Sequence, residues 1–256
     1  MIHRINSKLL AHPVKVLVVG AGGTGSHVLT GLAQLHHAMV ALGHPGGLEV
    51  QVIDSDTVSA TNVGRQMFFP SDIGRNKAEV LVQRLNMAMG LNWHAIDGRL
   101  TDLGETHNLD IVIGCVDNRA TRKALAGYDG YNTLYWLDCG NTQYGGQIVL
   151  GQVGGREKGL PHIGELFPET IDASLDASDD VPSCSMAEAL EKQSLFINRA
   201  MALYGLNLLS DLFRYGQIDY HGVFVNLKSA RTAPIKVDPE VWARMGYKQE
   251  EAKQAA

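Results

Sequence analysis

Four glycines in a row of six residues form the first group whose spacing indicates chemistry: Gly20, Gly22, Gly23 and Gly25. They follow an apolar run at 16–19, which is typical of a strand buried on both faces, and they precede a helical pattern. Glycine lets the backbone turn sharply against a ligand, and free N–H groups at a helix start attract anions. The sequence therefore predicts the phosphate loop of a dinucleotide- or nucleotide-binding βαβ unit, with a glycine-rich surface turn as the alternative.

Two acidic residues follow the next strand pattern at 48–54. Asp54 and Asp56 lie about thirty residues beyond the glycines, somewhat further than the usual spacing of about twenty. An acid at this place accepts hydrogen bonds from a ribose hydroxyl in dinucleotide sites. We therefore expect these two residues to lie at the nucleotide.

A polar and cationic segment separates this strand from the next helix. It contains Asn62, Arg65, Gln66, Arg75 and Lys77. Arginine presents a planar fork for phosphate oxygens and lysine a compact point charge, so the segment predicts contact with an anion. A solvated loop with its charges in water is the alternative.

Another apolar strand pattern, at 109–116, ends in Asp117 and Asn118. In open α/β sheets ligands gather outside the carboxyl ends of the strands, and a carboxylate suits Mg²⁺ carried by a triphosphate. We therefore predict that Asp117 binds Mg²⁺. Its alternative role is to cap the following helix, to which Asn118 can equally contribute.

The remaining patterns define the expected architecture. Strands are expected at 135–140, at 145–153 as an antiparallel neighbour, and at 220–230 and 234–237 near the end of the chain. Helices are expected after the glycines, at 77–87 and at 186–215. The predicted fold is α/β, a Rossmann-like, mostly parallel sheet with helices on both faces and antiparallel C-terminal strands. The buried candidates on the long last helix are Leu190, Phe196, Ile197, Met201, Leu208, Leu209 and Leu212.

One domain over 1–256 is the expected organisation. Residues 154–183 have no clear periodicity, which predicts a crossing loop or disorder, and about 247–256 form a polar tail. Residues 1–12 are expected to form an arm or helix with an apolar stripe of Ile5, Leu9 and Leu10.

Composition excludes several classes of protein. The chain is 45% hydrophobic and 19% charged, as in ordinary globular proteins, and its net charge of -5 predicts no nucleic-acid binding. It has no apolar run of about 18 residues and no leader pattern, which predicts no membrane span. Three cysteines without a CxxC pair predict neither a disulfide framework nor a zinc site, and a cytoplasmic location is expected.

Five blocks carry a resemblance: VVGAGGTGS, IDSDTVSATNVGRQMF, IGRNKAEVLVQRLN, IGCVDNRATRKAL and LDCGN. In this order and spacing they resemble the ThiF/MoeB type of the ubiquitin-activating enzyme superfamily over nearly the whole chain. The layout is also similar to the ThiF-family branch of the plasmid-borne PRTRC gene system. The resemblance implies Mg-ATP-dependent adenylation of the C-terminal carboxylate of a small ubiquitin-like or sulfur-carrier protein, with release of pyrophosphate.

The resemblance also implies roles for individual residues. The glycine loop would approach ATP, Asp54 would hold the ribose with Asp56 beside it, and Asp117 would bind Mg²⁺. Phosphates would be bound by Asn62, Arg65 and Lys77, with Gln66 nearby. Arg65, Lys77 and Asp117 would thus serve catalysis, because acyl-phosphate formation needs its developing negative charge neutralised.

Cys184 lies where thioester-forming members of the family carry a cysteine. The resemblance implies that it accepts the carrier protein; a plain loop cysteine is the alternative, since Ser183 and Ser185 provide no activating base. Cys115 and Cys139 lie in apolar strand patterns and are expected to act as small hydrophobic residues.

The resemblance further implies a homodimer. Relatives reach the partner subunit's nucleotide with an arginine on an N-terminal arm, and only Arg4 precedes the first strand here. Zinc ligands found in many relatives have no counterpart in this chain.

Two other functions compete with adenylation. The glycine loop and Asp54 alone would suit an NAD-dependent oxidoreductase, which leaves the cationic segment unexplained. A non-catalytic module of the same fold could bind a partner protein. A relative that adenylates a small molecule or an RNA base is a further enzymatic variant.

Overall fold

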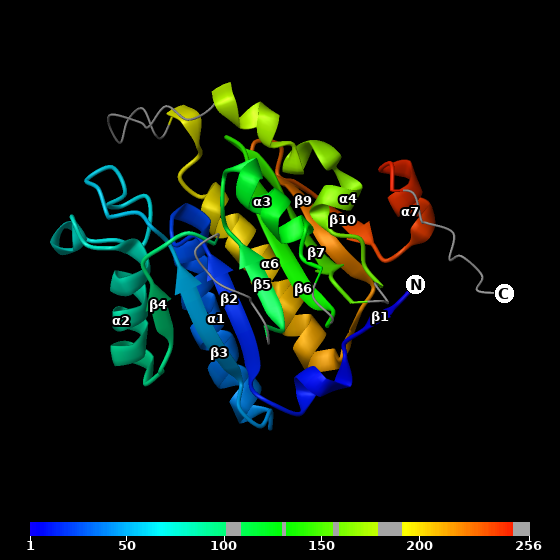
Figure 1. The fold of residues 1–256 in the computed structure, drawn as a ribbon, viewed down its shortest axis with the longest axis horizontal. Helices are drawn as coiled ribbons and strands as arrows, with labels where there is room; N and C mark the ends of the chain where they lie inside the picture. The colour runs from blue at the N-terminus through cyan, green and yellow to red at the C-terminus, as the bar shows by residue number, and fades with distance from the viewer. Residues whose placement is uncertain (101–108, 130–131, 156–158, 179–190, 248–256) are drawn as a thin grey trace.

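A computed structural model of the protein describes residues 1–100, 109–129, 132–155, 159–178 and 191–247. Its strands (β), helices (α) and 3₁₀ helices (η) are arranged as drawn in Figure 1. In chain order they are β1 (His3–Arg4), η1 (Ser7–Leu10), β2 (Val14–Val19), α1 (Gly23–Ala41), β3 (Leu48–Ile53), η2 (Pro70–Asp72), α2 (Lys77–Met89), β4 (His94–Ile96), β5 (Ile111–Gly114), α3 (Arg119–Ala126), β6 (Leu134–Asn141), β7 (Gly145–Val153), α4 (Ile163–Leu166), η4 (Pro168–Ile171), η5 (Ala173–Ser178), α6 (Ile197–Tyr215), β8 (Gln217–Ile218), β9 (Tyr220–Asn226), β10 (Arg231–Lys236) and α7 (Pro239–Arg244).

Eight strands form one sheet in the order β10-β9-β7-β6-β5-β2-β3-β4. The pairs from β6 to β4 are parallel, whereas β6/β7, β7/β9 and β9/β10 are antiparallel. The predicted mostly parallel sheet with antiparallel C-terminal strands is therefore confirmed. The chain runs outward from β2 to β3 and β4 and then returns to β5 on the other side of β2. A reversal of this kind opens a crevice at the carboxyl ends of the strands.

Helices cover both faces of the sheet. Helices α1 and α6 pack side by side behind it in Figure 1, and α3 and α4 lie in front. Strand β2 is buried from both sides, with Val16, Leu17 and Val18 at most 1% exposed, as its continuous apolar run predicts. Gly31 on α1 allows the close contact with α6, because a Cβ at this position would overlap the side chain of Leu206.

The long helix expected at 186–215 is interrupted, so this prediction is wrong in part. Residues 191 and 192 are helical, 193–196 are not, and α6 begins at Ile197. The break coincides with a bond outside the helix, since the backbone N–H of Ser194 donates to the carbonyl oxygen of Gln143 at 2.8 Å. Phe196 is 59% exposed instead of buried. The predicted core positions within α6 are buried: Ile197, Met201, Leu208, Leu209 and Leu212. The remaining candidate, Leu190, lies outside the described residues.

The segment expected to be a crossing loop or disordered, 154–183, contains three short helices, α4, η4 and η5, so the alternative of disorder is wrong for most of its described part and the crossing loop stays a prediction. Helix α4 starts with reciprocal caps: His162 Nδ1 accepts from Gly164 N–H, and Glu165 accepts from His162 N–H at 2.9 Å. Leu160 and Ile163 are each 1% exposed, which anchors the segment to the core. Its end, with Cys184, lies outside the described residues, as does nearly all of the expected polar tail.

The N-terminal arm is held by its own two-stranded sheet, in which β1 pairs with β8. Ile5 and Leu9 are buried as expected, whereas Leu10 is 39% exposed, so the predicted apolar stripe is wrong at that position. The short elements β1, β8, β4 and α7 were not predicted, because two to six residues are too few to establish a periodicity.

Helix α7 is attached to the sheet through a buried histidine. Nε2 of His221 accepts a hydrogen bond from Trp242 Nε1 at 2.8 Å, and its Nδ1 lies 2.9 Å from the carbonyl oxygen of Leu150. Because tryptophan can only donate, Nδ1 carries the proton and His221 is neutral. Burial lowers the pKa of His221 to about 4.

This histidine makes stability depend on pH in a defined window. His221 binds a proton near pH 6.5 in the unfolded chain but only near pH 4 in the folded protein. The stability that the neutral histidine contributes is therefore fully present above pH 6.5 and is lost as the pH falls through 4, because protons bind preferentially to the unfolded chain. The loss expected from His221 is about 3 kcal/mol. Urea unfolding between pH 7 and pH 4 should show a shallower pH dependence in His221→Phe than in the wild type. Parallel profiles would contradict the role of His221.

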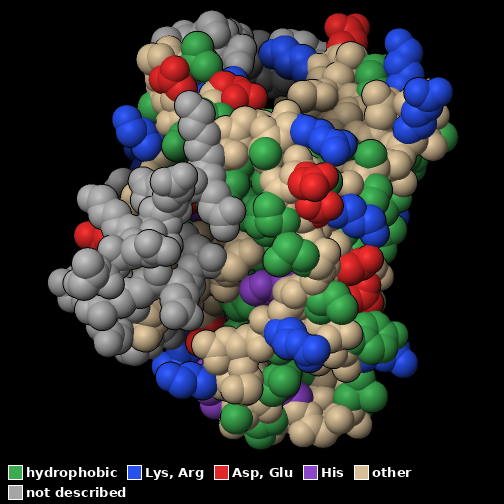
Figure 2. All heavy atoms as spheres, turned by 90° about the vertical axis from the view of Figure 1, so that its right-hand side faces the viewer, with side chains coloured by type: hydrophobic (Ala, Val, Ile, Leu, Met, Phe, Trp, Pro, Cys, Tyr) green, Lys and Arg blue, Asp and Glu red, His purple; other side chains and the backbone are tan. Residues whose placement is uncertain are grey.

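The surface carries mixed charges. On the face drawn in Figure 2, Lys and Arg side chains are interspersed with Asp and Glu. None of the described helices is long and apolar enough to cross a membrane.

Candidate active site

The glycine turn lies where the carboxyl ends of β2, β3 and β5 meet. Gly20 has a φ of 90°, and a Cβ there would lie 2.7 Å from the carbonyl oxygen of Cys115. A Cβ at Gly25 would overlap the carbonyl oxygen of Gly20. Both positions therefore require glycine, because the backbone of the turn passes directly against itself and against the end of β5.

Helix α1 begins directly after this turn and offers an anion site. Its N-cap residue, Gly22, makes no capping bond through a side chain, and the first helical residues are Gly23 and Thr24. The N–H groups of a first turn have no partner within the helix, and the helix dipole places positive charge there. The start of α1 thus favours a phosphate group, as the glycine pattern predicts.

Asp54 shapes the turn from the neighbouring strand end. Its Oδ2 accepts a hydrogen bond from Ala21 N–H at 2.6 Å, and its Oδ1 accepts one from Asp56 N–H at 2.8 Å. Burial raises the pKa of Asp54, and these two hydrogen bonds oppose that shift. The structure brings Asp54 to the glycine turn as expected; ribose binding stays a prediction.

Lys77 is the buried cation of the site. It is the first residue of α2, its side chain is 10% exposed, and its Nζ pairs with Oδ2 of Asp56 at 2.8 Å. Asp56 is 67% exposed, so the pair opens to solvent on the acidic side. In the structure Asp56 therefore holds Lys77, and its contact with a nucleotide stays a prediction.

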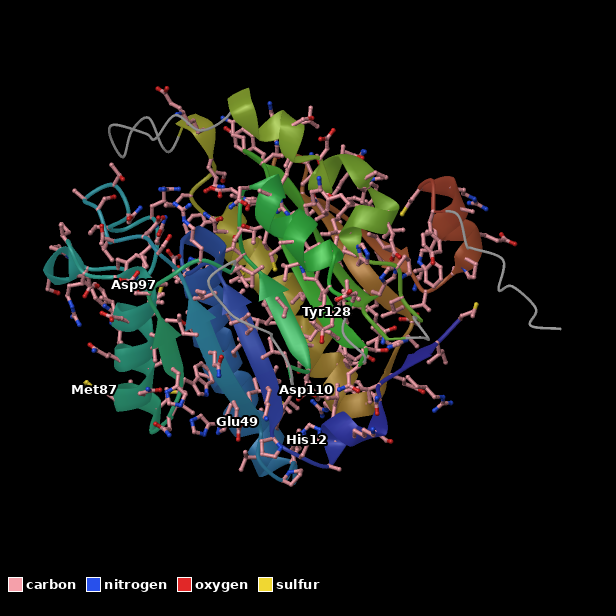
Figure 3. The ribbon with its side chains drawn as sticks, viewed as in Figure 1. His12, Glu49, Met87, Asp97, Asp110 and Tyr128 are labelled. Atoms are coloured by element: carbon pink, nitrogen blue, oxygen red, sulfur yellow. The ribbon has the colours of Figure 1, made fainter. Side chains whose placement is uncertain are left out.

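The start of α2 is fixed by Asn76, which the sequence analysis did not assign a role. Its Oδ1 accepts from Glu79 N–H, and its Nδ2 donates to the carbonyl oxygen of Asp54 at 2.8 Å and to Asp97 at 3.1 Å. Figure 3 shows Asp97 beside the start of α2, beyond the end of β4. Asn76 thus joins β3, β4 and α2 and positions Lys77. The motif IGRNK was the available signal, since an Asn before a helix start is a good cap.

Arg65 and Gln66 lie next to the glycine turn with unused hydrogen-bonding capacity. Nη1 of Arg65 donates to Gln193 Oε1 at 3.2 Å, whereas Nε of Arg65 and Oε1 of Gln66 are buried without a partner among the described residues. Burial lowers the pKa of Arg65. The Oε1 of Gln66 lies 4.0 Å from the point where a Cβ of Gly22 would be. A buried polar atom without a partner is costly, which suits a place where a ligand binds.

Asn62 maintains the loop that carries these side chains. Its Oδ1 accepts from Ser59 N–H at 2.9 Å, and its carbonyl oxygen accepts from Gln66 N–H at 2.9 Å. Asn62 is 7% exposed, and both of these contacts lie within the loop. Phosphate binding by Asn62 stays a prediction.

Two residues of the last third of the chain complete the cluster, and the sequence analysis missed both. Asn198 is 3% exposed; its Oδ1 accepts from Thr24 Oγ1 at 3.0 Å and its Nδ2 donates to Gln193 Oε1 at 2.8 Å. A Cβ at Gly23 would lie 2.6 Å from Asn198 Nδ2. Neither Asn198 nor Gln193 belongs to a recognisable motif, so the sequence contained no signal for them.

Asp117 is exposed at the end of β5, three residues beyond the last strand residue. The helix cap belongs to Asn118, whose Oδ1 accepts from Thr121 N–H at 2.8 Å, so the alternative capping role of Asp117 is wrong. Arg122 fixes the turn between β5 and α3, because its Nη2 donates to the carbonyl oxygen of Val116 at 2.9 Å.

Arg122 in turn forms a buried ion pair. Its Nε lies 2.8 Å from Oδ1 of Asp138, and the Asp138 side chain is 1% exposed. Burial raises the pKa of Asp138, and Arg122 opposes that shift. Both residues lie within the blocks that carry the family resemblance, but no charge pattern in the sequence pairs them.

The residues present fit a magnesium ion carried by a nucleotide. Mg²⁺ commonly takes one or two protein carboxylates and completes its shell with phosphate oxygens and water. Asp117 is one exposed carboxylate just beyond the end of β5, against which Gly20 packs. Within the described ranges no group of three His, Cys, Asp or Glu side chains could hold a metal ion by itself.

Cys139 is buried in β6, and Cys115 follows β5 partly exposed. A hydrogen bond to Cys115, together with burial, raises the pKa of Cys139 well above its usual range. Burial thus disfavours a thiolate at Cys139, as expected of a small core residue.

A cleft of about 610 Å³ lies at the opposite, amino-terminal edge of the sheet, near His12, Glu49 and Asp110 (Figure 3). Among the described residues, its lining mixes both charge signs and contains no glycine and no uncapped helix start. We assign the candidate site to the carboxyl edge, because there glycine backbone, cations and unpaired polar atoms converge.

A sequence profile of the ThiF family matches residues 6–240. The chain belongs to the ThiF family. This confirms the resemblance drawn from the five sequence blocks. It also agrees with the observed fold, because the matched range extends from before β2 into α7.

This ThiF-family chain is similar to subunits of larger activating enzymes. It is 33% identical over 175 residues to the NEDD8-activating enzyme E1 catalytic subunit of Dictyostelium discoideum, covering 64% of this chain and 37% of the relative. Identity to the SUMO-activating enzyme subunit 2 of the same organism is 27% over 149 residues, covering 56% and 21%. The chain thus spans about a third or less of the length of these relatives.

Solved structures share the fold. A structure of E. coli MccB with ATP has a TM-score of 0.59 at 19% identity, covering 88% of this chain and 64% of that chain. A second, of MccB with AMPCPP and MccA, has a TM-score of 0.61 at 19% identity, covering 88% and 65%. The fold of this chain is therefore that of ThiF/MoeB-type Rossmann-like enzymes.

Proposed function

We propose that the protein uses Mg-ATP to adenylate the C-terminal carboxylate of a small ubiquitin-like or sulfur-carrier protein and releases pyrophosphate. The observation that carries this proposal is one sheet edge where an uncapped helix start, the buried Lys77 and the partly unpaired Arg65 surround a glycine turn. This arrangement suits a polyanion held against backbone. The names of the NEDD8- and SUMO-activating relatives support the class of partner, and the MccB structure with ATP supports the nucleotide.

In this proposal the residues have separate tasks. The glycine turn and the start of α1 take phosphate oxygens, Asp54 takes the ribose with Asp56 beside it, and Asp117 takes Mg²⁺. The remaining phosphate contacts come from Asn62, Gln66, Arg65 and Lys77.

The chemistry requires charge stabilisation more than a protein nucleophile. A carboxylate oxygen of the partner attacks the α-phosphorus, the new O–P bond forms, and the bond to pyrophosphate breaks. Lys77 and Arg65 stabilise the negative charge that gathers on the α-phosphate and on the leaving pyrophosphate. Magnesium, when bound, supplies further charge neutralisation at the phosphate oxygens.

Four parts of the expectation remain predictions. A thioester on Cys184 would follow adenylation, and this residue lies outside the described chain. A homodimer would place Arg4 at the partner's nucleotide; here Arg4 lies in β1, opposite Gln217 of β8. The PRTRC-type assignment and a cytoplasmic location are likewise unchanged predictions.

Calorimetric titration of the wild-type protein with ATP plus Mg²⁺, and separately with NAD, tests the proposal. We expect saturable binding of ATP and none of NAD, because Arg65 and Lys77 supply more positive charge than a dinucleotide pyrophosphate needs. NAD binding without ATP binding would favour the oxidoreductase. Binding of neither would favour a partner-binding module.

A further inference from the structure

Gln193 accepts two hydrogen bonds on one oxygen. Its Oε1 accepts from Arg65 Nη1 at 3.2 Å and from Asn198 Nδ2 at 2.8 Å. Asn198 is in turn held by Thr24 on the first turn of α1. A chain of side chains thus runs from the anion-binding helix start, through Asn198 and Gln193, to the guanidinium of Arg65.

The segment that carries Gln193 is itself fixed in place. Ser194 N–H donates to the carbonyl oxygen of Gln143 at 2.8 Å, and the side-chain amide of Gln143 donates to the carbonyl oxygen of Glu191. The non-helical residues 193–196 are therefore tied to the turn between β6 and β7. Gln193 consequently reaches Arg65 from a backbone that is anchored independently of the loop carrying Arg65.

We propose that Gln193 is a positioning residue that holds Arg65 toward the phosphate-binding turn. This inference rests on the proposed function, because it assumes that Arg65 binds phosphate. Arginine has many rotamers, and fixing them costs free energy on binding unless another group has already ordered the side chain. Gln193 takes up one N–H of the guanidinium and leaves the buried Nε without a partner among the described residues. The amide oxygen of Gln193 thus orients Arg65 without neutralising its charge. A carboxylate at the same place would pair with the guanidinium and cancel the charge that a phosphate needs.

Titrations of the full chain with Mg-ATP and with adenosine test this role. Gln193→Ala should weaken ATP binding about tenfold, the effect of losing one hydrogen bond to a charged group. Adenosine affinity should stay unchanged, because adenosine has no phosphate for Arg65. In an Arg65→Ala background the same change should have no further effect on ATP.

Gln83→Ala is the matched control. Gln83 Oε1 also accepts from an arginine, Arg75 Nη2, at 2.6 Å, but on the exposed side of α2. This variant should bind ATP as the wild type does. If Gln193→Ala binds ATP like Gln83→Ala, weakens ATP and adenosine equally, or adds its full effect to Arg65→Ala, the positioning role is wrong. Failure of the proposed function is distinct, since the wild type itself would then bind no ATP.

Discussion

Replacing Lys77 by Ala is expected to reduce ATP-dependent pyrophosphate release by about 10²–10³-fold, the range seen when one donor to developing negative charge is removed. Lys77 is a buried cation of the site, and its Nζ is held at 2.8 Å from Asp56. A charge fixed in a poorly solvated place stabilises phosphate oxygens more strongly than one in water. The measurement is pyrophosphate release, together with ATP affinity by calorimetry.

The fold should survive this change. Asp56 is 67% exposed, so it remains solvated when its partner is lost. Lys236→Ala is the control, because it removes the lysine of another ion pair, Lys236–Asp219 at 3.1 Å, in which both side chains are more than half exposed. Undiminished pyrophosphate release by a folded Lys77→Ala protein would exclude the proposed phosphate role.

The second large effect concerns stability. Arg122→Met is expected to lower the free energy of unfolding by about 3–5 kcal/mol, the cost of removing one partner of a buried ion pair. It leaves the carboxylate of Asp138 without its only charged partner among the described residues, although Oδ2 already lacks a hydrogen bond there. For a domain of this size the melting temperature should fall by roughly 6–20 °C. Thermal unfolding and urea titration both measure the change.

An exposed arginine provides the control for this experiment. Arg244 pairs with Glu240 at 3.7 Å with both side chains about four-fifths exposed, and Arg244→Met should cost no more than about 1 kcal/mol. Adding Asp138→Leu to Arg122→Met should recover part of the loss, because the buried charge disappears with its partner. Equal destabilisation by Arg122→Met and Arg244→Met would show that the buried pair is not a main support of the fold.

Local pattern was enough for the main elements of the sheet. The apolar runs that became β2, β3, β5, β6 and β7 are continuous or alternating, and burial between two layers of helices demands such runs. The same local pattern predicted the positions of the main site residues at strand ends and helix starts, because their neighbours make these ends recognisable. These are the glycine turn, Asp54, Lys77 and Asp117. The match to the ThiF family confirms the resemblance. The order of the five sequence blocks carried more information about it than any single block.

The start of α6 shows what local pattern did not determine. The periodicity at 186–215 suited one helix, but the backbone of Ser194 bonds to Gln143, about fifty residues earlier in the chain, and residues 193–196 leave the helix. Helical propensity is worth tenths of a kcal/mol per residue, so a tertiary contact overrides it.

The sequence by itself determined the fold class and the placement of charged residues at the ends of strands and helices. Only the tertiary structure decided how these residues are held. Arg65 meets Gln193 across 128 positions and Thr24 meets Asn198 across 174, and Arg122 finds Asp138 only after β5 and β6 pair. Hydrogen bonds and buried ion pairs act over about 3 Å in space, whatever the separation along the chain, so no motif records them.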